Sequence, residues 1–393
     1  MTERTANEGN DTLGANLGRR LSVAILGTRG YPSYYGGFET AVRHLAPYLT
    51  NAGWDVTVYG RPGATREDDP SMDSRVTRRT SPGLDTKSIS TLSFGLTSTL
   101  DAVWRKPDVA LVMNVANGYW LPLLRARGIP TLVNVDGIEW DRAKWGRIAK
   151  AVFHTGAVAT SKHATGLVYD SHEIARRWGA EFHTEGTFIP YGGVHPNADL
   201  PLEEGLEHRG YVLVVARFVP ENTIPEFIEA ARTLSADFEI VIVGSTGYGG
   251  PLDEAVASLT ATSTRVHWLG HINDDARLYS LWQHAGAYFH GHSVGGTNPA
   301  LVQAMACGAP VIARDTPYNR EVLGGAGHFT APDAVAIARA VREVMQTSEL
   351  QEVLAANSVK RSLGEYSWES VCSKYEFELR SLATAPQGKP TRE

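Results

Sequence analysis

Residues 290–310 read HGHSVGGTNPALVQAMACGAP, in which a glycine-rich loop leads into a helix and then into a buried strand. Gly295 and Gly296 allow the backbone to approach a ligand closely, and Asn298 followed by Pro299 is a favourable helix start. A helix that begins there offers unpaired N–H groups and a partial positive charge to an anion. The stretch therefore predicts a phosphate site, although an ordinary loop before a capped helix would have the same pattern.

The same stretch also predicts where its helix ends. Gly308 is placed as a left-handed cap, and Pro310 prevents the helix from continuing. Residues 310–313 are short and apolar, as expected of a buried strand.

The composition is that of an ordinary globular protein with more than one core. A chain of 393 residues exceeds one ordinary domain, which suggests two cores of fairly equal size. A net charge of -6 argues against general nucleic-acid binding. Cys307 and Cys372 match no metal spacing, which favours a reduced cytoplasmic setting. Cys307 is interpreted as a small core residue rather than a nucleophile.

The sequence shows no pattern typical of a membrane span or of a signal peptide. No segment reaches the roughly 18 apolar residues that a span needs. Residues 1–20 are polar and lack the apolar core of a signal peptide. We therefore expect these residues to be a disordered tail and the protein to be cytoplasmic.

Apolar runs separated by helical patterns predict an α/β fold in the first half of the chain. Residues 21–27 are a compact apolar run, typical of a buried parallel strand, and a helix is expected over residues 38–52. A second strand over residues 55–59 completes the order found in a doubly wound sheet. Further apolar runs in this half are residues 109–113, 131–135, 157–160 and 187–190.

The pattern restarts after a polar stretch, residues 196–209, which is interpreted as a linker. Strands are expected at 211–216, 238–243, 266–269, 287–290 and 311–313, with a helix at 224–234. Two Rossmann-like domains in tandem are therefore predicted, over residues 21–195 and 210–365, with ligands in a cleft beyond the carboxyl ends of the strands.

The last helix is predicted within residues 366–383, and a second disordered tail over 384–393. Trp368, Val371, Tyr375 and Leu379 lie on one side of this helix, which is more often a core face than a cofactor box. We expect the helix to pack across the domain junction.

The loops exclude some ligands. The first loop reads GTRGYPSYYGG rather than G-x-G-x-x-G, and its following strand ends at Tyr59, Gly60 and Arg61, which argues against a dinucleotide oxidoreductase. No D-x-D occurs, so the usual carboxylate pair for a metal-held sugar nucleotide is missing. Metal-free phosphate binding through helix N-termini and cations is expected, with no cofactor.

Two charged residues stand where such a ligand would lie. Arg217 follows the strand at 211–216, so it is placed at the cleft, although a surface arginine would have the same position. Glu39 follows Gly36 and Gly37, where it either orients a sugar hydroxyl or is a favourable charge in a helix's first turn.

Five stretches together resemble one family. The retaining GT-B glycosyltransferases of family 4, and more closely their bacterial rhamnosyltransferase-like branch, are similar to this chain over about residues 21–382. The stretches are TRGYPSYYGGFET (28–40), VNVDGIEWDRAKW (133–145), ARFVPEN (216–222), HGHSVGGTNPALVQAM (290–305) and PYNREVLGGAG (317–327). The resemblance implies that residues 21–195 bind the acceptor and residues 210–365 the nucleotide-sugar donor.

The resemblance implies a donor site with two departures from the family pattern. Gly36 and Gly37 match the glycine loop near the donor phosphates, and Arg217 matches the arginine of a cation pair. Asn222 occupies the position of the usual lysine, as is common in the branch. The family's two glutamates fall on Gly295 and Gln303, and the backbone of Gly295, Gly296, Thr297 and Asn298 would form the cradle for the leaving group.

Gln303 lies five residues past Asn298, or roughly 7 Å along a helix, so a diphosphate at the helix start puts the nucleoside sugar near it. An uncharged amide both donates and accepts hydrogen bonds. We therefore expect a weaker hold on a ribose diol, which suits a deoxyribose donor such as a dTDP-sugar. Neutral substitution explains the residue equally well.

The resemblance also implies residues close to the reacting sugar. Asp136 matches the region of such a family residue, with a simple Asp-Gly turn as the alternative. Glu321 aligns with a family acid near the donor sugar, although an ordinary glutamate at a helix start is the alternative. With Arg217, these are the expected catalytic residues.

Aromatic residues and cations alternate in one stretch of the first half. Trp140, Arg142, Lys144 and Trp145 would suit a lipid-linked diphosphate acceptor at an anionic membrane surface, here the inner face of the plasma membrane. A solvated helix face with two packed tryptophans has the same pattern.

The sequence therefore predicts a retaining, metal-independent glycosyltransferase. The expected reaction moves rhamnose from dTDP-rhamnose to a lipid-linked or oligosaccharide acceptor in capsule, exopolysaccharide or cell-wall glycan synthesis. A sugar-nucleotide epimerase on the same fold, and a lapsed transferase that only binds nucleotide sugar or glycan, remain as alternatives.

Overall fold

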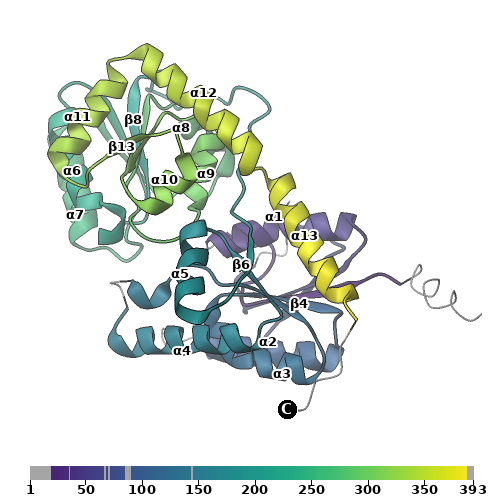
Figure 1. Cartoon of the computed structure of the whole chain (residues 1–393). Coiled ribbons are helices and arrows are strands. Elements are labelled where there is room, and N and C mark those ends of the chain that lie inside the picture. The colour runs from purple at the N-terminus through teal and green to yellow at the C-terminus, as the bar shows by residue number, and fades with distance from the viewer. Residues whose placement is uncertain are drawn as a thin grey trace, which may run out of the picture.

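The computed structural model shows two α/β units, each built on its own parallel sheet, with a long helix running back from the second unit to the first (Figure 1). It describes residues 19–34, 36–65, 68–69, 71–84, 90–142 and 145–386. The expectations for Lys144 and for most of the two terminal tails fall outside these residues. We call the first unit the N-terminal domain and the second the C-terminal domain.

The N-terminal domain has a seven-stranded sheet in the order β3-β2-β1-β4-β5-β6-β7, and every neighbouring pair is parallel. Its strands are β1 (Ser22–Leu26), β2 (Asp55–Gly60), β3 (Thr77–Thr80), β4 (Val109–Met113), β5 (Thr131–Asn134), β6 (Gly166–Tyr169) and β7 (Thr187–Phe188). Its helices are α1 (Gly37–Asn51), α2 (Ser90–Arg105), η1 (Val115–Trp120), α3 (Leu121–Ala126), η2 (Glu139–Asp141), α4 (Arg147–His163) and α5 (His172–Phe182).

The C-terminal domain has a six-stranded sheet in the order β10-β9-β8-β11-β12-β13, again with parallel pairs. Its strands are β8 (Tyr211–Val215), β9 (Glu239–Val243), β10 (Val266–Gly270), β11 (Ala287–His290), β12 (Val311–Arg314) and β13 (His328–Thr330). Its helices are η3 (Pro220–Asn222), α6 (Ile224–Leu234), α7 (Pro251–Thr262), α8 (Asp275–His284), α9 (Pro299–Ala306), α10 (Pro317–Leu323), α11 (Ala334–Met345) and α12 (Ser348–Glu365).

Both sheets are buried on two faces because successive strand residues point to opposite sides. In β1, Val23 and Ile25 pack with α1, whereas Ala24 and Leu26 pack with the helices on the other face. In β8, Val212 joins the core under α6 and α11. This explains why the central strands are nearly continuous apolar runs, and the predicted two-domain α/β architecture is confirmed.

The strands β3, β6 and β13 were not predicted from the sequence, and the strand predicted over residues 157–160 is part of a helix. Residues 157–160 lie inside α4, where their apolar residues face η1 rather than a sheet. β3 reads TRRT and lies at a sheet edge, and β6 and β13 have only four and three residues. Short or polar strands give too little periodic signal to be recognised.

The stretch at 196–209 contains no helix or strand, yet it is fixed to α8. The N–H of Leu200 donates to Oε1 of Gln283 at 2.8 Å, and Arg277 pairs with Glu203 at 2.6 Å. These contacts hold the segment on the C-terminal domain, so it is a docked connection rather than a loose tether.

The final helix α13 (Trp368–Thr384) crosses the junction, as predicted, and packs in the N-terminal domain beside α1 (Figure 1). Val371, Cys372, Tyr375 and Leu379 are buried in the same core as β1 and α1. Trp368 stacks on His44 at a ring distance of 4.2 Å. One face of the first domain is therefore completed by the end of the chain.

The strand order of each sheet contains one reversal at which a crevice is expected. Chain order reverses between β1 and β4 in one sheet and between β8 and β11 in the other. Ligands of open α/β sheets bind beyond the carboxyl ends of the strands at such reversals. A ligand is therefore expected at the loops after β1, β8 and β11.

Candidate active site

Arg217 and the loop at 291–298 lie side by side because they follow β8 and β11, which are neighbouring strands. Arg217 is exposed, and its guanidinium has no hydrogen-bond or ion-pair partner within the described part of the chain. Gly295 has φ 107°, a left-handed conformation that favours glycine. A free cation and a glycine-rich loop thus share one edge of the sheet.

The helix after this loop is capped by its own residue. Asn298 Oδ1 accepts the N–H of Ala300 at 2.9 Å and that of Leu301 at 3.4 Å, as the sequence predicted for an N-cap. Gly308 has φ 74°, which confirms the predicted left-handed cap at the other end. The N–H groups of Ala300 and Leu301 already donate to Asn298, so they are not available to bind a phosphate at the predicted site.

Thr297 is also engaged, across the domain junction. Its N–H donates to the main-chain oxygen of Asp170 at 3.2 Å, and its hydroxyl donates to the same oxygen. The N–H groups of Gly295, Gly296 and Asn298 have no acceptor among the described residues. The expected cradle is therefore smaller than predicted, and it consists of these three amides.

The N-terminus of α1 supplies the open helix end instead. Gly36 is its N-cap and provides no side-chain cap, and the first intrahelical bond is from Thr40 N–H to Gly36 O at 3.0 Å. The N–H groups of residues 37–39 have no acceptor among the described residues. A Cβ on Gly37 would lie 3.3 Å from Pro299 Cγ, so the two helix starts meet across the junction.

Glu39 is buried in the first turn of α1. Its Oε1 accepts the N–H of Arg29 at 3.0 Å, which ties the loop after β1 to the helix. A buried carboxylate with a backbone donor serves to fix this loop. The structure places it beside the expected phosphate position.

Asn222 does not point into the cleft. It is buried, and its Nδ2 donates to the main-chain oxygen of Arg217 at 2.8 Å. The side chain that replaces the family's lysine therefore fixes the backbone that carries Arg217. His292 lies close to Arg217. Burial and the charges of Arg217 and Arg142 lower the pKa of His292 to about 3, so this histidine is neutral at physiological pH.

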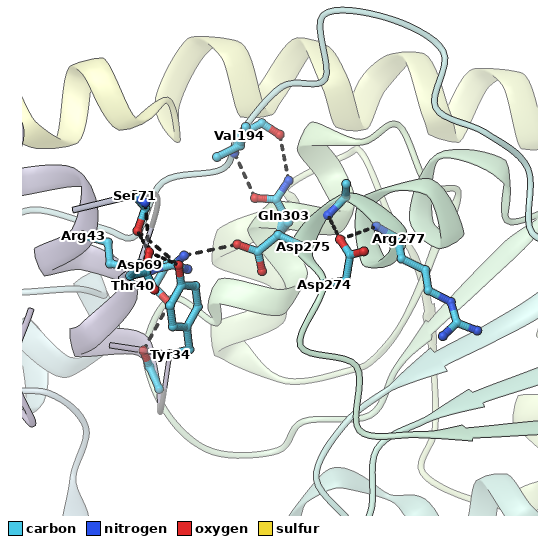
Figure 2. A network of polar contacts seen from close by, with 12 residues as sticks. Tyr34, Thr40, Arg43, Asp69, Ser71, Val194, Asp274, Asp275, Arg277 and Gln303 are labelled. Atoms are coloured by element: carbon cyan, nitrogen blue, oxygen red, sulfur yellow. Dashed lines mark hydrogen bonds and ion pairs between the residues drawn. The ribbon is translucent and has the colours of Figure 1, made fainter. Parts of the chain in front are cut away.

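Gln303 has a partner other than the expected ribose. Its Oε1 accepts the N–H of Val194 at 2.9 Å, and its Nε2 donates to the Val194 oxygen at 2.7 Å (Figure 2). Nε2 also donates to Cys307 Sγ at 3.3 Å. Both amide hydrogens are thus used, and the pair fixes the connection between the domains.

Glu321 belongs to α10 of the C-terminal domain, and its carboxylate lies at the start of α5 in the N-terminal domain. Oε1 accepts the N–H of His172 at 2.7 Å, and Oε2 accepts the Ser171 hydroxyl at 2.9 Å and the N–H of Glu173 at 3.2 Å. A carboxylate satisfies unpaired N–H groups and the partial positive charge at a helix start. In this arrangement Glu321 caps α5 across the domain junction, and its expected place near the donor sugar stays a prediction.

Asp136 lies next to a carboxyl group that the sequence analysis missed. Asp136 follows β5 with φ 62°, and Asp170 follows the adjacent β6. Burial raises the pKa of Asp170 well above its usual value, and the charges of Asp136 and Glu321 raise it further. In the sequence, the only signal for Asp170 as a site residue is its position directly after the short strand β6.

Arg142 points into the junction rather than toward solvent. Its Nε lies 2.6 Å from Oε1 of Glu139, and a Cβ on Gly295 would lie 3.7 Å from its Nη2. The predicted membrane contact is therefore wrong for this arginine, because Glu139 is buried and holds it inward. A second cation thus stands beside the glycine loop.

The two tryptophans of that stretch are packed. Trp140 makes edge contacts with Trp178, Phe182 and His154 at ring distances of 6.1, 5.9 and 5.6 Å. Trp145 Nε1 donates to Glu139 Oε2 at 2.7 Å. The alternative interpretation, two packed tryptophans, is the one observed.

A cavity of about 640 Å³ opens between the domains. Its lining comes from the loops after β1 and β2 and from the start of α8, and includes Arg29, Tyr34, Asp69, Asn273 and Asp275. Arg43 pairs with Asp275 at 3.2 Å and lies over the Tyr34 ring at 4.0 Å, which bridges the domains at this cavity (Figure 2).

Comparison with known proteins defines the class of the chain. Residues 36–192 match a Glycosyl transferase 4-like domain, and residues 203–361 match the Glycosyl transferases group 1 domain. Each half of the chain thus matches a glycosyltransferase domain, and the two parallel sheets have the two-domain GT-B architecture.

Relatives of the chain are named as mannosyltransferases. The chain is similar to the phosphatidyl-myo-inositol mannosyltransferase of Mycolicibacterium smegmatis, with 31% identity over 57% of this chain and 62% of that protein. It is also similar to O-antigen chain mannosyltransferase B of Escherichia coli, with 25% identity over 42% of this chain and 44% of that protein. The aligned regions thus span about half the length of these relatives.

Solved structures confirm the fold. Sucrose-phosphate synthase from Thermosynechococcus elongatus has a TM-score of 0.77 at 20% identity, covering 93% of this chain and 100% of that one. HepE from Anabaena, solved with UDP-glucose, has a TM-score of 0.73 at 14% identity, covering 92% of this chain and 100% of that one.

Proposed function

We propose that the protein transfers a sugar from a nucleoside diphosphate donor to a hydroxyl of a lipid-linked or oligosaccharide acceptor, with retention of configuration and without a metal. The observation that carries this proposal is the convergence of unsatisfied donors at one place. These donors are the N–H groups of Gly295, Gly296 and Asn298 and those at the open start of α1, with the guanidinium of Arg217 after the neighbouring strand.

These groups suit a departing diphosphate. In glycosyl transfer the sugar–phosphate bond breaks and negative charge develops on the leaving oxygen. Preorganised N–H groups and cations lower the barrier by stabilising that charge, and one such donor contributes about 10²–10³-fold in rate. Arg142 lies beside the same loop and adds a second positive charge.

The nucleoside is proposed to lie toward the cavity between the domains, whose lining includes Arg29, Asp69 and Asp275. The reciprocal pair with Val194 leaves Gln303 without a free amide hydrogen. A weak hold on a ribose diol supports a deoxyribose donor, so dTDP-rhamnose remains the specific proposal.

The relatives raise a competing donor sugar. Two of them are named as mannosyltransferases, so mannose competes with rhamnose as the proposed donor sugar. Competition among dTDP-rhamnose, GDP-mannose and UDP-glucose for transfer decides the question. Transfer from GDP-mannose alone would contradict the rhamnose proposal while leaving the transferase proposal intact.

Contact with a membrane surface is proposed through the start of α4, because the stretch first expected to make it is partly packed. Ile148 is 83% exposed and follows the exposed Arg147. No helix in the described residues is long and apolar enough to cross a bilayer. Binding of anionic vesicles that is unchanged in Arg147→Glu would count against this contact.

Incubation with nucleotide sugars, with and without a lipid-diphosphate sugar, tests the function. Transfer to the acceptor is expected. Isomerised donor without transfer would favour the epimerase, and binding alone would favour a glycan-binding module.

Arg217→Ala should lower kcat/KM about 100-fold. The matched variant Arg232→Ala changes an exposed arginine of α6 that pairs with Glu229, and it should leave the activity unchanged.

A further inference from the structure

Asp170 is a carboxylic acid sealed into the domain junction. It follows β6 directly, has an exposed fraction of 2%, and its Oδ1 is a buried atom with no hydrogen-bond partner among the described residues. Buried side-chain oxygens nearly always have a partner, so an exception calls for a reason.

The Asp170 carboxyl lies against the glycine loop of the other domain. A Cβ on Gly296 would lie 2.0 Å from Oδ1 and 2.6 Å from Oδ2. The Asp170 main-chain oxygen meanwhile accepts the N–H and the hydroxyl of Thr297. The loop is therefore held by the Asp170 backbone, and the carboxyl group is left beside the Gly296 amide, which is one of the proposed phosphate donors.

The surroundings favour a neutral carboxyl group. Asp136 after β5 and Glu321 on α10 face it with negative charge, Arg142 with positive charge, and the buried phenols of Tyr191 and Tyr375 lie near it. Burial, with the two carboxylates, raises the pKa of Asp170 well above its usual value. A protonated carboxyl group has one O–H donor, whereas a carboxylate has none.

We propose that Asp170 binds the donor substrate as a neutral acid, donating a hydrogen bond to the sugar–diphosphate end next to Gly296. This rests on the proposed function, since it requires a diphosphate at the glycine loop. A carboxylate at the same place would repel the diphosphate. A neutral donor removes that repulsion and satisfies the buried oxygen when the substrate is bound.

The test is the affinity for UDP, dTDP and GDP, measured by titration calorimetry over a series of pH values from about 4 upward. Asp170→Ala removes the donor and should weaken binding about 10- to 100-fold, as expected for one hydrogen bond to a charged group. Asp170→Asn keeps a neutral donor and should stay within about threefold of the unmodified protein.

The pH dependence separates a chemical role from a structural one. As pH rises through the elevated pKa of Asp170, ionisation should weaken binding to the unmodified protein but not to Asp170→Asn. The matched variant Asp237→Asn changes an exposed aspartate that faces Arg342, and it should keep the decline.

Three outcomes overturn the inference and leave the proposed function intact. They are equal affinity of all variants, an Asp170→Asn that is as weak as Asp170→Ala, and persistence of the decline with pH in Asp170→Asn. Absence of nucleotide binding by the unmodified protein would instead overturn the proposed function, and the inference with it.

Discussion

A pair of glycines stands at the start of α1 and another stands just before α9. The two helices differ in whether a side chain accepts their first N–H groups. At α9, Asn298 accepts two of the first N–H groups, and Thr297 is bound to Asp170. At α1, Gly36 offers no side chain, and the N–H groups of residues 37–39 are unsatisfied in the described part of the chain. The stretch that looked like the phosphate site is closed at its helix, whereas the less typical first loop is open.

The difference shows that one motif can serve two purposes. The second loop contributes amides before the helix and contacts with the opposite domain, and the first contributes the helix end itself. Because Gly37 lies against Pro299, the two meet in one place. The proposed anion site therefore takes its N–H groups from both domains and not from one helix alone.

The largest expected effect comes from Gly296→Ala. The added Cβ would lie 2.0 Å from Asp170 Oδ1, so the loop must move, and a displacement near 1 Å costs about 10²-fold in kcat/KM. Gly37→Ala would place a Cβ 3.2 Å from the Tyr191 ring and should cost much less. Similar losses in both variants, measured by steady-state transfer, would show that the two loops are equivalent.

The two buried carboxyls next to the glycine pairs differ in hydrogen bonding, and the carboxyl of Asp170 should make stability depend on pH. Glu39 has a backbone donor, whereas Asp170 Oδ1 has none among the described residues. The Asp170 pKa is raised above 3.8, so the folded state holds this proton more tightly than the unfolded state. The associated stability is fully present at low pH and is lost as pH rises from about 4 toward the raised pKa.

The unfolding free energy of Asp170→Asn relative to the unmodified protein should therefore increase with pH, by up to about 1.4 kcal/mol per pH unit in that window. Denaturant titrations at several pH values measure this difference. A constant difference would mean that Asp170 is not protonated in the folded protein.

Closing the open helix should weaken donor binding. Gly36 has an extended φ of -171°, so Gly36→Ser is sterically allowed and supplies a cap to α1. We expect a few tenths of a kcal/mol of added stability but about tenfold weaker nucleotide binding, because an amide is diverted from the phosphate. Calorimetry and thermal unfolding measure both, and tighter binding would remove α1 from the site.

The smallest effect is expected from opening the closed helix. Asn298→Ala removes the α9 cap and should cost about 1 kcal/mol of unfolding free energy. Nucleotide affinity should change little, since the N–H of residue 298 remains. A matched variant is Asp333→Ala, which removes the cap of α11, away from the junction. A large loss of affinity in Asn298→Ala alone would place the phosphate on the α9 helix end.

Local chemistry was readable from the sequence, and pairing between domains was not. The Asn298 cap, the Gly308 turn and the strands of the central sheet depend on neighbouring residues, and these predictions are confirmed. The cap that Glu321 places on α5 joins residues 149 apart, and the Gln303–Val194 pair joins residues 109 apart. No periodicity encodes such contacts.

Burial also escaped the sequence analysis where two domains create it together. Asp170 follows a four-residue strand, and it becomes a sealed acid only because the loop of the other domain lies on it. Arg142 looked like a surface cation because its neighbours are charged, but the buried Glu139 holds it inward. The residue types at the site could be predicted, whereas their directions could not.

The position of α13 determines the order in which the two domains can complete their cores during synthesis. Most of the N-terminal domain leaves the ribosome first, yet its core lacks Val371, Tyr375 and Leu379 until the last helix has emerged. The C-terminal domain is contiguous in the chain and can be assembled before that point. The domain that is made first is thus finished last, and nascent chains stopped before residue 368 should expose an apolar face over α1 that a chaperone would recognise.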